Sequence, residues 1–517
     1  MNSVGSGIQQ SRGRVRLTNA TSAARRPCTA AVTELTAVQE VCSTRPLYYS
    51  AMQPLLDRRG EVAALEAAWA SASVGMPQLV VVWGRRRVGK TFLMLHMLDR
   101  LPRDVLRVYH AATQQAEHVE LARFAESVER DLGSDVAALA GGGFTSWEAV
   151  LRFLTALGRQ RPLAVVLDEV TYLTASTPGF ASIVQSVWDR ESAASASHLM
   201  LVLTGSSVGT IERMLGGQGA LHRRPTLELR LDPVDLPAAA EFLPGLGPEG
   251  LVEAYAACGG YPLHLLAWDS DTGAEENLLR LAGSPGGLLL TDARGMLQEE
   301  LPDTGGYQRI LAAVGRGRTR HSQIRTEADQ RVEQPLDVLV RVRLVRRSTP
   351  VGAPRRATPH YEIADPYLRF WFAVLYADVQ LVEAGQGRAV LRRAGAAWQG
   401  HLGWTFEEAA RAHCQRLVTR GVLPDDLVVG RWWTSTGPPR EVDVLGLQRN
   451  QAALLGEAKW TATPLGHREV EKLRRTLAYV PDPVEDPWLA LWGRAGLDRA
   501  ARAPKVLGYS AADVVTP

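Results

Sequence analysis

The stretch GRRRVGKT at residues 84–91 has the spacing G-x-x-x-x-G-K-[ST]. The apolar run LVVVW at 79–83 precedes it, and apolar residues at helical spacing continue through 92–98. A strand, a glycine-rich turn and a helix in this order predict a loop whose backbone N–H groups surround phosphate oxygens at a helix N-terminus. We therefore expect a nucleoside triphosphate site here, in preference to a chance glycine-rich turn.

Four residues of this stretch have distinct expected roles. Gly84 and Gly89 let the backbone turn its N–H groups inward. Lys90 would reach the β- and γ-phosphates, and the Thr91 hydroxyl would bind Mg²⁺. The expected cofactors are therefore ATP and Mg²⁺.

A second apolar run, LAVVLDE at 163–169, ends in two carboxylates. A continuous apolar run is typical of a strand buried on both faces of a parallel sheet, and ligands bind at the carboxyl ends of such strands. Asp168 would hold Mg²⁺ through water, and Glu169 would orient and deprotonate the attacking water. The alternative is a polar loop after an ordinary strand.

A third run, LMLVLTGSS at 199–207, ends in hydroxyls. In P-loop ATPases with an additional strand, this position senses the γ-phosphate, so Ser206 is the candidate, with Thr204 and Ser207 as neighbours. A plain strand-ending turn is the alternative.

The composition is that of an ordinary globular protein, with 517 residues, 46% hydrophobic and 22% charged. This length has room for about three or four domains. No apolar run approaches the ~20 residues that a membrane helix needs. The four cysteines have neither zinc-site nor disulfide-framework spacing, which favours a reducing cytosol, so the expected location is cytoplasmic with no membrane partner.

Residues 1–51 differ from the rest, because they carry six Arg against two Glu and have no core pattern. An organellar transit peptide has a similar composition. We favour a start codon assigned too early, just before Met52, or a disordered tail.

The remaining pattern predicts four further parts. Strands alternate with helices over 52–235, which predicts a parallel α/β sheet, and a helical lid follows at 236–300. Short helices and a two-stranded hairpin at 301–366 predict a winged helix. Helices and strands at 367–517 form the last part, and the aromatic residues at its beginning are expected in a core.

Arginine is abundant in the expected winged helix. Nine Arg stand against four acidic residues over 316–347, and Arg355 and Arg356 lie in the expected wing. This excess could give salt-dependent DNA binding, or the segment could be a hinge or a protein contact; both interpretations stay open.

From about residue 53 to 475 the order of the parts resembles archaeal-type P-loop ATPases of the STAND branch that carry a C-terminal DUF234 region. Besides the loop and the Asp168-Glu169 pair, four short segments resemble motifs of that family: DRRGE at 57–61, LHRRPT at 221–226, GYP at 260–262, and Tyr361 to Phe372.

The resemblance implies roles for two more residues. Pro262 of the lid would pack against the nucleotide. Arg224 falls on the family's arginine and would contact phosphate, in cis or across a subunit interface, so oligomerisation is open. Arg223 replaces a usual glycine, which leaves open which arginine acts.

A second constellation lies near the C-terminus. REVDVLG at 440–446 and AALLGEAKW at 452–460 alternate like the strands of a hairpin, so Glu457 and Lys459 should share one face, with Asp443 on the partner strand. This pattern resembles the PD-(D/E)xK nuclease core, as the DUF234 resemblance also implies, and Glu407 matches the acidic residue of its first helix.

The residue types suit phosphodiester hydrolysis. Carboxylates bind Mg²⁺ together with substrate phosphate, and Lys459 would position or deprotonate water. An exposed Glu–Lys pair on a hairpin is the alternative. The combined prediction is an ATP-hydrolysing switch coupled to a nucleic-acid-directed, Mg²⁺-dependent nuclease-like domain, with DNA as a partner. An ATPase scaffold with an inert protein-binding module and an ATP-responsive winged-helix regulator remain alternatives.

Overall fold

A computed structural model of the protein describes residues 55–138, 143–193, 196–301, 304–353, 357–434 and 440–517. The extension expected at 1–51 lies outside these ranges, as do Arg355 and Arg356 of the expected wing.

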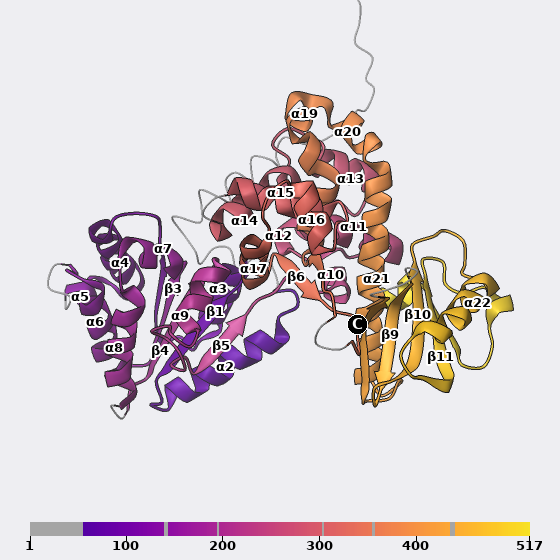
Figure 1. Ribbon diagram of the computed structural model, residues 1–517. Helices are drawn as coiled ribbons and strands as arrows, with labels where there is room; N and C mark the ends of the chain where they lie inside the picture. The colour runs from indigo at the N-terminus through magenta and orange to yellow at the C-terminus, as the bar shows by residue number, and fades with distance from the viewer. Residues whose placement is uncertain (1–54, 139–142, 194–195, 302–303, 354–356, 435–439) are drawn as a thin grey trace, which may run out of the picture. The chain divides into compact units, whose positions relative to one another are not determined.

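The first sheet has five parallel strands in the order β2-β3-β4-β1-β5 (Figure 1). Its strands are β1 (Gln78–Trp83), β2 (Leu106–Ala111), β3 (Leu163–Asp168), β4 (Leu199–Gly205) and β5 (Leu227–Arg230). Every residue of β3 and β4 is buried, as their continuous apolar sequences predict. Because β4 lies between β1 and β3, the phosphate loop after β1 is next to the end of β4.

Both faces of this sheet are covered, and β1 shows it. Val80 and Val82 belong to one hydrophobic core, whereas Leu79, Val81 and Trp83 belong to another. Alternate residues of a strand point to opposite faces, so each core is one face of the sheet packed against helices. The helices of this part are α2 (Arg59–Ser73), α3 (Lys90–Arg100), α4 (Glu117–Leu132), α5 (Ser134–Ala138), α6 (Trp147–Gly158), α7 (Val170–Ser176), α8 (Phe180–Ala193) and α9 (Val208–Leu215).

Helices then follow one another without a strand. They are α10 (Leu236–Phe242), α11 (Pro248–Cys258), α12 (Pro262–Ala267), α13 (Ala274–Leu281), α14 (Leu288–Glu300), α15 (Thr304–Gly315), α16 (His321–Ala328) and α17 (Glu333–Arg341). An antiparallel pair, β6 (Val345–Ser348) and β7 (His360–Ile363), comes next. Short helices followed by a two-stranded hairpin is the order predicted at 301–366; the winged-helix assignment and the domain boundaries stay predictions.

The aromatic segment begins at α18 (Pro366–Phe370), whose first turn is capped by Asp365 accepting from the Leu368 N–H at 2.9 Å. Tyr367 and Phe370 are fully buried, so the expectation that these aromatics form a core is confirmed. The chain continues through π-helical turns (Trp371–Leu375, Val382–Gln386), a 3₁₀ turn (Tyr376–Asp378), α19 (Val379–Leu381), α20 (Gly387–Arg393) and α21 (Gly395–Thr419).

The C-terminal sheet is mixed, with the order β12-β11-β10-β9-β8. Its strands are β8 (Leu427–Trp433), β9 (Glu441–Gln448), β10 (Gln451–Lys459), β11 (Pro483–Gly493) and β12 (Val506–Tyr509), with the helices α22 (His467–Thr476) and α23 (Ala511–Val515). The pairs β8–β9 and β9–β10 are antiparallel, whereas β10–β11 and β11–β12 are parallel.

The hairpin predicted between β9 and β10 closes with two residues, Arg449 (φ 51°) and Asn450 (φ 70°). Two consecutive residues at positive φ are typical of the type I′ turn, whose twist matches that of paired strands. The predicted class, a P-loop-type parallel α/β sheet with helices and a separate C-terminal α/β part, is confirmed. Within the described ranges, none of the helices has the length and apolar character needed to cross a membrane.

Candidate functional site

The loop between β1 and α3 requires its two glycines. A Cβ on Gly84 would lie 2.1 Å from the Leu231 carbonyl oxygen, so no larger residue fits there without backbone movement. Gly89 has φ +94°, a conformation that L side chains rarely adopt, and α3 begins immediately after it. The prediction of a tight glycine-dependent turn at a helix N-terminus is therefore confirmed by the geometry.

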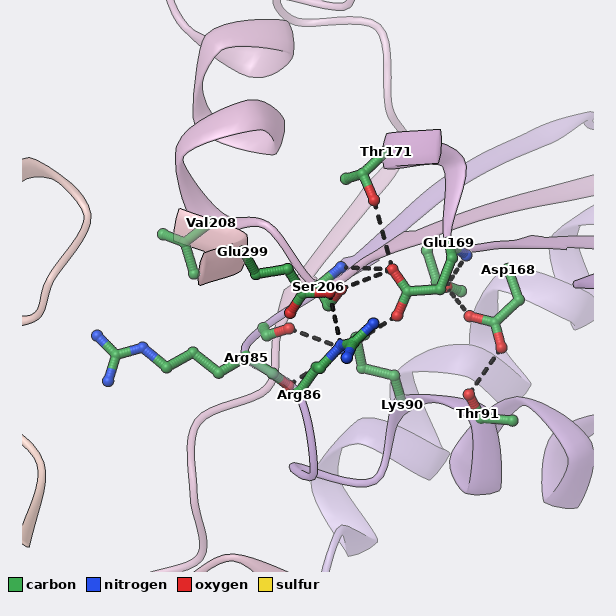
Figure 2. Close-up of polar contacts among 12 residues, drawn as sticks. Arg85, Arg86, Lys90, Thr91, Asp168, Glu169, Thr171, Ser206, Val208 and Glu299 are labelled. Atoms are coloured by element: carbon green, nitrogen blue, oxygen red, sulfur yellow. Dashed lines mark hydrogen bonds and ion pairs between the residues drawn. The ribbon is translucent and has the colours of Figure 1, made fainter. Parts of the chain in front are cut away.

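Lys90 is buried and is held by the loop itself. Its Nζ donates to the carbonyl oxygens of Gly84 (2.9 Å) and Arg85 (3.1 Å) and lies 3.8 Å from Glu169 Oε1 (Figure 2). The ammonium thus lies inside the loop, between the backbone and the glutamate that follows β3.

Asp168, at the end of β3, is only 2% exposed and accepts from three hydroxyls. Thr91 Oγ1 and Tyr109 Oη each donate at 2.7 Å, and Thr204 Oγ1 donates from β4. The Thr91–Asp168 contact places a hydroxyl and a carboxylate oxygen side by side, which are hard oxygen donors of the kind that Mg²⁺ takes alongside nucleotide phosphates and water. The two side chains therefore fit the predicted metal.

Glu169 has left-handed backbone angles, φ 59° and ψ 46°. A non-glycine residue in this region costs on the order of 1 kcal/mol and is typical of functional sites. Its Oε2 accepts from the Ser206 N–H (3.0 Å) and Ser206 Oγ (2.7 Å) (Figure 2). The structure thus brings the predicted Ser206 to Glu169, whereas the neighbouring Ser207 caps α9 by accepting from the Thr210 N–H.

Glu299, near the end of α14, is a site residue that the sequence did not indicate. Its Oε1 lies 3.0 Å from Ser206 Oγ and 2.6 Å from Arg86 Nε. Burial and the nearby Glu169 carboxylate raise the pKa of Glu299, although Arg86 and Lys90 oppose the shift. In Figure 2 the side chains of Arg86, Ser206 and Glu299 converge.

The other two loop arginines also have acidic partners. Arg87 Nε lies 3.3 Å from Asp292 Oδ1, on α14, and Arg85 lies 3.6 Å from Asp365 Oδ2. Burial lowers the pKa of Arg85, but Tyr261 and Asp365 together raise it. Three consecutive arginines in the loop were the only sequence signal for these contacts.

The segment DRRGE at 57–61 contacts the phosphate loop through Arg58. Arg58 donates to the carbonyl oxygens of Val88 (3.2 Å) and Asp232 (2.6 Å) and pairs with Glu61 at 3.0 Å. Arg58 and Glu61 therefore link the start of α2 to the phosphate loop.

Of the two residues carried over from the resemblance, one lies at the loop and one does not. Pro262 Cγ would be 4.0 Å from a Cβ placed on Gly89, so the lid proline is adjacent to the loop. Arg224 instead pairs with both carboxylate oxygens of Asp189, at 2.9 and 3.1 Å, and has no contact with the phosphate loop within the described part of the chain.

Beside the loop is a cavity of about 670 Å³ with an arginine-rich lining. Its lining includes Gly84 and Arg85 on one side and Arg341, Arg343 and Arg347 on the other. Among the described residues, Arg341 and Arg347 form no ion pair, whereas the lining acids Glu212, Asp232 and Asp365 pair with Arg343, Arg230 and Arg85.

In the C-terminal sheet, Glu457 and Lys459 lie together as predicted, and Lys472, which the sequence did not indicate, joins them. Lys459 Nζ lies 3.2 Å from Glu457 Oε1, as expected for residues two apart on a strand. Lys472 of α22 donates to both Glu457 oxygens, at 2.5 and 2.7 Å. Asp443 is close by, since its Oδ2 accepts from the Ala458 N–H at 2.9 Å.

Two carboxyl groups here are crowded. Burial and the nearby Asp443 raise the pKa of Glu407, on α21, to about 8. Burial and the neighbouring acids Glu457 and Glu441 raise the pKa of Asp443 to about 6. Acidic groups brought together in this way are a frequent feature of functional sites, though ion-pair networks also produce them.

The described residues contain no cluster of three or more His, Cys, Asp or Glu side chains arranged to hold a metal ion. Glu407, Asp443 and Glu457 supply oxygen donors of a type that suits Mg²⁺, but both Glu457 oxygens are engaged by Lys472. A metal at these three residues stays a prediction.

Comparisons with known proteins match two regions of the chain. Residues 55–267 match the model of an ATPase domain predominantly from Archaea. Residues 371–473 match DUF234, a family of archaeal and bacterial proteins of unknown function. An uncharacterized protein of Methanocaldococcus jannaschii, MJECL04, is 25% identical over 434 residues, which cover 82% of this chain and 90% of the relative.

Solved structures show a more distant likeness. The Walker-type ATPase PABY2304 of Pyrococcus abyssi has 19% identity and a TM-score of 0.45, covering 62% of this chain and 98% of its own. The ORC2 protein of Aeropyrum pernix, in ADPNP–ADP complexes, has 14% identity and a TM-score of 0.42, covering 68% of this chain and 98% of its own. Because these TM-scores are low, we assign the fold from the strand order of the parallel sheet and not from the similarity to these solved structures.

The strand order, the loop geometry and the two family matches agree: this chain contains an ATPase domain of the predominantly archaeal type, followed by a DUF234 region.

Proposed function

We propose that the protein binds and hydrolyses ATP and that nucleotide state acts as a switch for its C-terminal part. One observation carries this proposal. Five predicted side chains from two strand ends and the start of one helix meet at a single edge of the parallel sheet: Lys90, Thr91, Asp168, Glu169 and Ser206.

Each side chain has a task that its position permits. Glu169 lies beside Lys90 and would orient the attacking water and accept its proton. Lys90 would exchange its two loop carbonyls for β- and γ-phosphate oxygens, and Ser206 would donate to the γ-phosphate. Thr91 and Asp168 would hold Mg²⁺, which offsets phosphate charge when bound.

The proposed switch is of the STAND type and involves the lid and a winged helix. Supporting this, the loop arginines pair with acids on α14 and at the start of α18. A ligand that binds the loop differently in two arrangements shifts the balance between them. Arg224, paired with Asp189, would act on a nucleotide only from a second copy of the chain.

A second candidate function is phosphodiester cleavage by the DUF234 region. The juxtaposition of Glu457 with Lys459, next to Asp443, favours it. In this proposal Asp443, Glu457 and Glu407 would bind Mg²⁺ and Lys459 would position the nucleophilic water, as in the PD-(D/E)xK nucleases that the segment resembles.

The first experiment measures phosphate release from ATP by the full chain with Mg²⁺. We expect Lys90→Ala to lose nucleotide binding and Glu169→Gln to keep binding while hydrolysis falls about 10²–10⁴-fold, the usual contribution of a general base. Arg224→Ala is measured alongside, since Arg224 lies outside the loop contacts and a loss of hydrolysis in this variant would indicate action from a second copy of the chain. Hydrolysis by Glu169→Gln at the wild-type rate would contradict the assignment of Glu169.

The second experiment measures cleavage of supercoiled plasmid and single-stranded DNA with Mg²⁺ or Mn²⁺, with and without ATP. Cutting that needs Asp443, tested as Asp443→Ala, and that changes in Lys90→Ala would support the coupled nuclease. An ATPase that cuts neither DNA would instead be a scaffold with a protein-binding module, or a DNA-binding regulator if salt-dependent DNA binding remains.

A further inference from the structure

Glu299 occupies a place surrounded by groups that ordinarily bind phosphate. Its carboxylate contacts the guanidinium of Arg86 and the hydroxyl of Ser206 (Figure 2). The positive charge of Lys90 also acts to lower the pKa of Glu299. The loop lysine and the strand-end hydroxyl are the groups assigned above to the γ-phosphate, and a loop arginine lies beside them. In this structure, a carboxylate of the same chain contacts the arginine and the hydroxyl.

The neighbouring residue holds Glu299 in that place. Glu300 accepts from the N–H groups of Val208 (2.8 Å) and Gly209 (3.3 Å), which open helix α9 directly after the Ser206 strand end. The end of α14 is therefore fixed against the turn that carries Ser206. Glu299, only 16% exposed, points from this anchor toward the loop.

The arrangement also limits what Ser206 can do. Its hydroxyl has a single hydrogen, yet its oxygen lies within hydrogen-bond distance of both Glu169 (2.7 Å) and Glu299 (3.0 Å). Two carboxyl groups compete for one donor, so Ser206 is fully engaged before any nucleotide arrives. A phosphate oxygen that approaches Ser206 has to displace one of them.

We propose that the Glu299 carboxylate holds the place of the γ-phosphate, and that Arg86 is the cis arginine that binds this phosphate once ATP has displaced Glu299. This inference rests on the proposed ATPase function. It assigns to Arg86 the phosphate contact that the resemblance gave to Arg224.

The chemistry of Arg86 suits this exchange. A guanidinium binds carboxylate and phosphate with the same planar set of N–H donors, so one anion can replace the other without a change of partner. The Arg86 side chain is 42% exposed, and besides Glu299 it donates to Tyr172 Oη at 2.7 Å.

The exchange distinguishes two nucleotides. ADP has no γ-phosphate and leaves the Arg86–Glu299 pair in place, whereas ATP must break the pair in order to bind fully. Glu299 therefore lowers the affinity for ATP without lowering that for ADP, and its release from Arg86 is the signal that α14 would pass on.

The test compares the binding of ADP and of a non-hydrolysable ATP analogue to the full chain by calorimetry. Glu299→Gln keeps the shape and removes the charge, so we expect analogue affinity to rise about tenfold, within the ~5–150-fold span of typical site coupling, while ADP affinity stays unchanged. Asp292→Asn is the matched control, since it removes the other α14 contact with a loop arginine but does not reach Ser206. It should leave the ratio of the two affinities unchanged.

The second measurement uses Arg86→Ala, which should lower the affinity for the analogue where Glu299→Gln raises it. The analogue should bind more weakly and ADP as before, and adding Glu299→Gln should not restore analogue binding. The inference is overturned if Glu299→Gln leaves the ratio of analogue to ADP affinity unchanged, or if Arg86→Ala weakens the binding of both nucleotides equally. Either result leaves the ATPase proposal standing. A wild-type chain that binds neither nucleotide refutes the proposed function itself.

Discussion

Acid should weaken the packing of α21 against α11 through one buried histidine. His401 is 1% exposed; its Nδ1 lies 2.9 Å from Arg369 Nη1, and its Nε2 lies 2.8 Å from the Ala256 carbonyl oxygen. A guanidinium can only donate, so Nδ1 accepts and Nε2 carries the hydrogen given to Ala256. The neutral ring satisfies both partners, and a second proton on Nδ1 would face Arg369.

The magnitude follows from the pKa. Burial and the nearby Arg369 lower the pKa of His401 from its ordinary 6.5 to about 3. Because the unfolded chain takes up the proton first, the stabilisation is complete above pH 6.5 and is lost as the pH falls toward 3. The loss approaches about 1.4 kcal/mol per pH unit below pH 6.5 and amounts to roughly 2.3 kcal/mol between pH 6.5 and 4.5, because the unfolded histidine is half protonated at pH 6.5.

Urea unfolding at several pH values, followed by tryptophan fluorescence, measures this loss. The variant His401→Gln is matched to the neutral ring, because its amide can accept from Arg369 and donate to Ala256 but does not titrate. The wild type should lose stability relative to the variant as the pH falls from 6.5 to 4.5. A difference between the two that stays flat across this window would refute the assigned tautomer and its burial.

Three further outcomes are expected. Gly84→Ala should abolish ATP binding in a nucleotide titration, because its Cβ would meet the Leu231 carbonyl at 2.1 Å; normal binding would show that the loop can move aside. Arg58→Lys should weaken ATP binding about tenfold, at roughly 1.4 kcal/mol, since an ammonium lacks the fork that binds Glu61 with one nitrogen and the carbonyls of Val88 and Asp232 with the other. Replacing Arg341 and Arg347 by Ala should reduce the slope of log DNA affinity against log salt by about 2, and an unchanged slope would exclude these arginines from a DNA contact.

The residues at the edge of the sheet beside the phosphate loop were predictable, because short stretches of sequence identify them. The spacing of Lys90 and Thr91 is a loop motif, and Asp168 and Glu169 end a buried apolar run. Parallel strands bring such ends together, so four residues distant in sequence could be assigned to one site. Ser206 was predicted from the strand-end position that senses the γ-phosphate in P-loop ATPases with an additional strand, and in the structure β4 lies next to β1.

Glu299 could not be found in this way. It is 93 residues from Ser206 and lies on a helix whose sequence has no motif, so only the packing of α14 brings the two together. Arg224 is the opposite case. A motif match suggested that it contacts phosphate, but in the fold its side chain pairs with Asp189.

In the C-terminal sheet, too, one contact was predictable from the sequence and another was not. The two-residue period of a strand predicted that Glu457 and Lys459 would meet. Lys472 was missed, since nothing in the sequence indicates which helix residue will lie over a strand, although it binds both Glu457 oxygens more closely than Lys459 does.

The hydrogen bonds of Lys90 to its own loop have a consequence for selectivity among anions. Any anion that draws the ammonium away must replace two charged hydrogen bonds, each with a net contribution of about 1.5–3 kcal/mol. A lone inorganic phosphate or sulfate gains the loop N–H groups in return, whereas a nucleotide gains these together with further phosphate contacts, the metal and the lid. The loop should therefore bind a nucleotide with its metal more tightly than it binds inorganic phosphate or sulfate.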